Sequence, residues 1–112
     1  MSRAAPAVCT GKDCRRSAGF EELQASLSGV AYVETKCLDV CKGPVVVVDP
    51  ASPDAVVLAK VRSPKQRRAL LLLVARGGDP PDRLARRAVT GSTRRRALRR
   101  LKISSPRPAS RL

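Results

Sequence analysis

The stretch CLDVCKGPVVVVDP, residues 37–50, decides the expected fold. Its second half follows a Gly-Pro break with four consecutive valines, residues 45–48, a run typical of a strand buried on both faces of a sheet. Its first half places Cys37 and Cys41 in a C-x3-C pair just before that strand. The stretch therefore predicts a loop that carries two thiols and leads into a buried strand.

A second pair of cysteines lies upstream. Cys9 and Cys14 form a C-x4-C pair after the short apolar run of residues 5–8, which predicts a first strand. Both pairs fall where a strand gives way to a loop, so four thiolates can converge at one end of a sheet. Gly11 and Gly43, with the adjoining amides, are well placed to give backbone N–H donors to sulfur.

The segment between the two pairs predicts one helix and one strand. Phe20, Leu23 and Leu27 recur at i, i+3 and i+7, which indicates one face of an amphipathic helix, and Gly29 can end it. Residues 30–35 alternate well enough for a second strand, which delivers the chain to the second cysteine pair.

The residues after the valine run predict a fourth strand and a capped helix. Residues 55–61 follow a proline-containing turn and suit a hairpin partner of the valine strand. Ser63 and Gln66 then form a capping box at the start of a helix that the glycines at 77–78 end. The order is β-α-β-β-β-α, and the expected fold class is α/β, with a β-α-β unit and a terminal helix over the sheet.

Composition narrows the chemistry of the cysteines. The chain has 112 residues, four cysteines, two aromatic side chains and no histidine. The opening MSRAAPAV lacks the apolar stretch of a signal peptide, and no apolar run is long enough to cross a bilayer, so we expect a cytoplasmic protein without membrane contact. In a reducing cytosol, such cysteines more often bind metal or carry out redox chemistry than form structural disulfides.

The spacing of the cysteines is compatible with several kinds of site. Structural zinc sites use C-x2-C to C-x4-C knuckles, which allow both pairs. The plant-type ferredoxin run C-x4-C-x2-C fails because Ser17 stands where its third cysteine would be. Zinc, buried structural thiols, and a dithiol that cycles through a disulfide therefore remain alternatives to an iron–sulfur cluster.

The two cysteine stretches together resemble a known family. VCTGKDCRRSAG, residues 8–19, and CLDVCKGPVVVVDP resemble the thioredoxin-like 2Fe-2S ferredoxins, which are related to the small 2Fe-2S subunit of respiratory NADH dehydrogenase. The resemblance covers about residues 5–78. It implies a small thioredoxin-like (ferredoxin) domain, often dimeric.

The same resemblance implies that one 2Fe-2S cluster is bound by Cys9, Cys14, Cys37 and Cys41. The chain departs from the family pattern in two places. The stretch between the pairs is short, and Asp39 puts a carboxylate in the second ligand loop. A more exposed and differently tuned cluster would follow.

The function that these features predict is one-electron transfer to and from a redox partner protein, an oxidoreductase. No catalytic residue is expected, because the sequence has no histidine, no nucleophile-and-base arrangement and no glycine-rich phosphate loop before a helix. One rival is a zinc-stabilised, basic nucleic-acid-binding module that uses the same four thiolates. A thiol-based or cluster-based redox sensor is another.

The C-terminal part of the chain differs in charge from the rest. Of the net charge of +14, residues 1–78 carry +5 and residues 79–112 carry +9. A helix over residues 94–103 would have an apolar stripe of only Ala97, Leu98 and Leu101, too narrow to dock strongly. We therefore expect residues 79–112 to be a separate, disordered or partly helical basic tail. Such a tail can bind nucleic acid or an acidic partner, but it lacks the aromatic side chains that stack bases.

Overall fold

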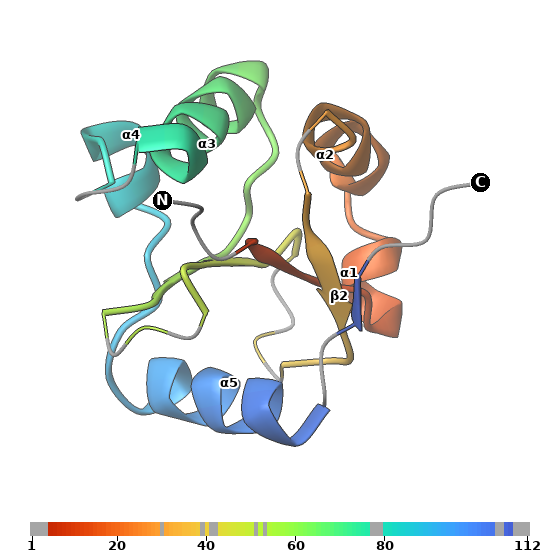
Figure 1. The fold of residues 1–112 in the computed structure, drawn as a ribbon, viewed down its shortest axis with the longest axis vertical. Helices are drawn as coiled ribbons and strands as arrows, with labels where there is room; N and C mark the ends of the chain where they lie inside the picture. Colours follow the sequence, from red (N-terminus) through yellow and green to blue (C-terminus); the bar gives the residue numbers. More distant parts are fainter. Residues whose placement is uncertain are drawn as a thin grey trace.

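The computed structural model describes residues 5–29, 31–38, 40, 43–50, 52, 54–76, 80–104 and 107–108. For residues 13, 103, 104, 107 and 108 it describes the backbone alone. The predicted α/β class is confirmed, since helices cover a mixed sheet with four principal strands (Figure 1). The glycines at 77–78, which were expected to end a helix, lie outside the described residues.

The sheet follows the predicted strands closely, although each strand is shorter. β1 (Ala7–Cys9), β2 (Val33–Thr35), β3 (Val46–Val48) and β4 (Val56–Leu58) lie in the order β4-β3-β1-β2. β1 pairs with β2 in parallel, whereas β3 is antiparallel to both β1 and β4. All residues of β1 and β3 are buried, because helices cover both faces of these central strands.

Two predicted helices form on one face of the sheet. α2 (Phe20–Leu27) begins after Gly19, whose left-handed φ of 87° suits a residue without a Cβ atom. α3 (Pro64–Arg76) begins with the predicted capping box. In that box the Gln66 N–H donates to Ser63 Oγ at 3.1 Å, and the Ser63 N–H donates to Gln66 Oε1 at 3.1 Å.

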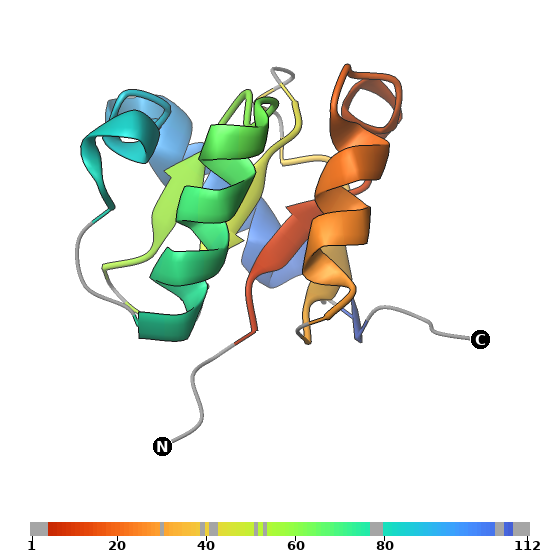
Figure 2. The same cartoon turned by 90° about the horizontal axis from the view of Figure 1, so that it is seen from above.

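The structure adds three elements that the sequence pattern did not predict: α1 (Lys12–Arg15) inside the first cysteine loop, and α4 (Asp82–Ala85) and β5 (Arg107–Pro108) after α3. The helix that the pattern allowed over residues 94–103 forms as α5 (Gly91–Ser104). α5 lies across the face of the sheet opposite α2, α3 and α4 (Figures 1 and 2). No described helix is long and apolar enough to span a membrane.

The expectation that the apolar stripe of the last helix is too narrow to dock strongly is wrong. Ala97 and Leu101 of α5 are 0% and 4% exposed, and Leu84 of α4 is fully buried. Both side chains of α5 belong to the buried cluster that also contains the sheet residues Val47 and Val57, so a narrow stripe is sufficient for docking.

Hydrogen bonds also fix the C-terminal part against the sheet. The Arg94 guanidinium donates to Ala55 O through Nη2 at 2.8 Å and Nε at 3.2 Å. The Val89 N–H donates to Val57 O at 2.8 Å along the outer edge of β4, while β5 pairs with the outer edge of β2. Two helices of the tail are thus packed on the domain, although whether residues 1–78 fold alone stays a prediction.

Two core clusters lie on the two faces of the sheet. One is shared by β-strand residues with α2, α3 and α4 and contains Val8, Phe20, Leu23, Leu27, Val46, Val48, Leu58, Val61, Leu70, Leu73 and Leu84. The other, beneath α5, contains Ala7, Cys9, Cys14, Leu38, Val40, Val45, Val47, Ala55, Val57, Ala59, Ala97 and Leu101. Both cysteines of the first pair therefore belong to the face that α5 covers.

Candidate metal centre

The first cysteine pair is built on the end of β1. Cys9 is the last residue of that strand, and its N–H donates to Val45 O of the adjacent segment at 3.0 Å. The next residue, Thr10, fixes the turn by donating its N–H and its Oγ1 to Thr35 O, each at 2.8 Å. α1 then returns Cys14 to the same place. Both cysteines are 2% exposed.

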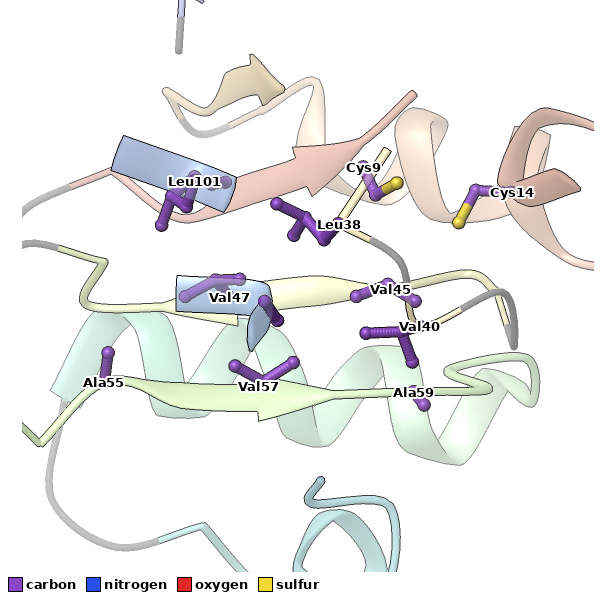
Figure 3. Close-up of a cluster of buried hydrophobic side chains, with 12 residues drawn as sticks. Cys9, Cys14, Leu38, Val40, Val45, Val47, Ala55, Val57, Ala59 and Leu101 are labelled. Carbon is purple, nitrogen blue, oxygen red and sulfur yellow. The ribbon is translucent and has the colours of Figure 1, made fainter. Parts of the chain in front are cut away.

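The two thiols of this pair interact directly, and the sulfur of Cys9 points toward Cys14 (Figure 3). The hydrogen bond that the Cys14 thiol donates lowers the pKa of Cys9 to about 6, against the opposing effect of burial. Backbone N–H donors of Gly11 and Leu38 act in the same direction. Cys9 is therefore the thiol of the pair that ionises first.

Cys14 shows the opposite shift. Its hydrogen bond to Cys9 raises the pKa of Cys14 well above the ordinary range, with burial and the negative charges of Cys9 and Cys37 adding to the effect. A backbone hydrogen bond from Val45 opposes it. Ionisation of the pair is therefore favoured at Cys9 and disfavoured at Cys14. A bound metal would favour the second ionisation, because it replaces the shared proton.

The second cysteine loop packs tightly against the first. A Cβ atom added to Gly11 would lie 2.8 Å from Cys37 Cβ, which is too close for any side chain. Likewise, a Cβ atom added to Gly43 would lie 2.9 Å from Cys14 Sγ. Of the two glycines that the sequence singled out as amide donors, Gly11 donates to Cys9, and both permit the close approach of the two loops. Cys9 Sγ lies 3.8 Å from Lys36 O, which belongs to the second loop.

Two arginines bind the backbone of the second loop. Arg62, between β4 and α3, donates to Gly43 O through Nε at 3.2 Å and Nη2 at 3.1 Å. Arg100 of α5 donates through Nε to Cys37 O at 3.1 Å. The loop is therefore held near both of its ends by guanidinium groups.

The predicted ligands are only partly brought together. Cys9 and Cys14 are in contact, and the half-buried Cys37 is next to them, whereas Cys41 and Asp39 lie outside the described residues. No group of three or more His, Cys, Asp or Glu side chains close enough to hold a metal ion occurs among the residues that the structure describes. The site therefore offers two adjacent thiols and a third in the abutting loop.

Sequence reasoning missed both arginines. Arg100 is 63 residues from its partner, and no local pattern distinguishes it from the other arginines of the tail. Arg62 directly precedes the capping serine of α3, and its 19-residue separation from Gly43 is equally invisible to local patterns.

No family model, curated protein or solved structure matches the chain.

Proposed function

We propose that this chain binds one 2Fe-2S cluster through Cys9, Cys14, Cys37 and Cys41 and acts as a one-electron carrier for an oxidoreductase partner. The observation that carries the proposal is the packing of two cysteine-bearing loops against each other at one end of the sheet. At Gly11 and Gly43 the loops are so close that a side chain would not fit between them. Such close packing is needed when residues far apart in sequence bind one small group.

The topology supports a thioredoxin-like domain as the scaffold. β1 and β2 are parallel with α2 between them in sequence, which is the β-α-β unit expected from the sequence. The β3–β4 hairpin and α3 complete the β-α-β-β-β-α order. α1, α4 and α5 are additions to that outline.

The donor set suits an iron–sulfur cluster. Thiolates are the preferred soft ligands, and N–H donors to sulfur stabilise their negative charge. Here Gly11 and Leu38 donate to Cys9, and Val45 donates to Cys14. When bound, the cluster would supply the one-electron redox chemistry. The surrounding residues would exclude water, since both cysteines of the first pair are buried beneath α5.

Charge near the site is also favourable. A cluster held by four thiolates is anionic, and the guanidinium groups of Arg62 and Arg100 lie on the loop that carries two of them. Lys12, Arg15 and Arg16 are exposed in and after α1. These cations would stabilise the anionic site and would attract an acidic redox partner to this end of the sheet.

A dithiol redox role is a second candidate because Cys9 and Cys14 are hydrogen-bonded to each other. In that case the two thiols would form a disulfide and pass two electrons and two protons to an oxidant such as another disulfide. Their burial argues against this role, since thiol–disulfide exchange requires an attacking sulfur to reach them.

Anaerobic purification followed by iron, sulfide and zinc analysis tests the proposal. We expect a red-brown protein with about two irons and two sulfides per chain. We also expect that changing Cys9, Cys14, Cys37 or Cys41 to Ala abolishes a stable cluster in each case. Stoichiometric zinc without iron would instead support the zinc-stabilised module. A colourless, metal-free protein whose Cys9 and Cys14 form a reversible disulfide would support the dithiol role.

A further inference from the structure

A cleft outside the cysteine site lies between the first turn of α3 and the segment that contains α4. It has a volume of about 290 Å³. Figure 2 shows α4 beside the first turns of α3. All of the lining side chains are polar or cationic: Ser63, Lys65, Gln66, Arg83, Arg86 and Arg87.

The cleft concentrates positive charge, because none of its lining residues is acidic, although Asp82 of α4 adjoins Arg83 in the sequence. Four of its six lining residues are cations, contributed by α3, α4 and the turn after α4. Within the described parts of the chain, none of these four is engaged in an ion pair. Like charges around one hollow repel each other, and an anion bound between them would relieve that repulsion.

The backbone on both sides of the cleft is fixed by the fold. On one side, Leu84 anchors α4 in the core with no exposed surface, and Arg87 O accepts a hydrogen bond from the Ala59 N–H at 2.9 Å. On the other side, the capping box holds the start of α3. Only the long side chains need to adjust on binding, so the cations are held together by the fold.

The hydrogen-bonding groups that remain in the cleft are donors. Ser63 Oγ accepts from the Gln66 N–H, and Gln66 Oε1 accepts from the N–H groups of Arg62 and Ser63. The hydroxyl proton of Ser63 and the amide NH₂ of Gln66 are then left to donate. Together with the guanidinium and ammonium groups, the lining therefore favours a ligand that is rich in acceptors and negatively charged.

We propose that this cleft binds a diphosphate group, either as inorganic pyrophosphate or as part of a nucleotide. Guanidinium groups match phosphate oxygens in pairs, and a diphosphate brings several negative charges together in one small volume. Contacts along a nucleic-acid backbone would require cations spread along a track, whereas these converge in a single cleft. No aromatic side chain lines the cleft, so a base would not be recognised by stacking. This proposal is independent of any cluster.

Calorimetric titration of the full-length protein with inorganic pyrophosphate tests the proposal. We expect saturable binding to one site that weakens as salt is added. Arg83→Gln combined with Arg86→Gln should weaken binding about tenfold or more, because two charged hydrogen-bonding groups are lost. The matched control is Arg95→Gln combined with Arg99→Gln, which removes the same charge from exposed positions of α5. It should change the affinity by no more than about twofold.

Further ligands separate the sources of the anion. ADP should bind at least as tightly as pyrophosphate if a nucleotide is the ligand, and more weakly if pyrophosphate itself is. Orthophosphate should bind about tenfold more weakly than either, because it offers fewer paired contacts. Three results would overturn the proposal. These are no saturable binding at millimolar pyrophosphate, equal weakening by the two double variants, and binding of a single-stranded oligonucleotide but not of the diphosphates.

Discussion

Replacing Leu101 of α5 by Ala tests whether the basic C-terminal helix is part of the folded core. The Leu101 side chain is 4% exposed and belongs to the cluster that also contains Cys9 and Cys14. Removing a buried leucine side chain costs its transfer free energy plus the energy of the cavity that remains. Because α5 lies in an outer layer and can relax toward the sheet, we expect the low end of the known range, about 2–3 kcal/mol.

Urea denaturation of the full-length protein measures this cost. With a denaturant dependence typical of small domains, the midpoint should fall by about 1–2 M while the slope stays unchanged. The matched control is Leu72→Ala in α3, which makes the same deletion at a side chain that is 50% exposed. It should lower the free energy of unfolding by less than about 1 kcal/mol. Equal, small effects of the two substitutions would refute the packing of α5 on the sheet.

Three further predictions concern the cysteine loops. In the cluster-free protein, ultraviolet absorbance should show Cys9 half-ionised near pH 6, and Cys9→Ser should abolish this titration. The pKa of Cys9 is lower in the folded than in the unfolded chain, so its ionisation should stabilise the fold. This stabilisation should grow as pH rises from about 6 toward 9 and should vanish as pH falls through about 6. Gly11→Ala should destabilise the protein by about 1–3 kcal/mol in thermal or urea unfolding because its Cβ would overlap the second loop, whereas Gly29→Ala, with open space around its Cβ, should not destabilise it. In a cluster-loaded protein, Arg100→Gln should lower the reduction potential measured by voltammetry, because it removes a positive charge near the site. Arg94→Gln, which removes the same charge from the other end of α5, should change it much less, and equal shifts would show that Arg100 acts only through net charge.

Local patterns predicted the elements whose causes are local. The capping box of Ser63 and Gln66 and the buried face of α2 form as expected, because each depends on residues within one or two turns. The four strands were found for a similar reason, since β-branched runs between turn residues mark them. The placement of Cys9 at the end of β1, and of Cys37 in the loop after β2, followed from these strands.

The docking of α5 could not be predicted in the same way. Its apolar stripe is narrow, and it is buried because it meets an apolar sheet face formed by residues far away in the sequence. Hydrogen bonds hold α5 in place, from Arg94 to Ala55 O and from Arg100 to Cys37 O. They join residues that are 39 and 63 positions apart in the sequence. A single arginine in an arginine-rich segment carries no signal of such a partner. Tertiary packing therefore decided the structure of a segment that composition alone indicated to be a separate, disordered or partly helical tail.

The C-terminal part also closes the sheet at its two sides. Residues 87–89 bond along the outer edge of β4, and β5 pairs with the outer edge of β2. An uncovered strand edge presents free amide and carbonyl groups that recruit strands from other molecules. A chain stopped at residue 78 would expose both edges at once, beside the valine-rich strands β3 and β4. In the full-length chain, the basic extension covers these edges and so opposes edge-to-edge aggregation. Its like charges also keep neighbouring molecules apart in solution.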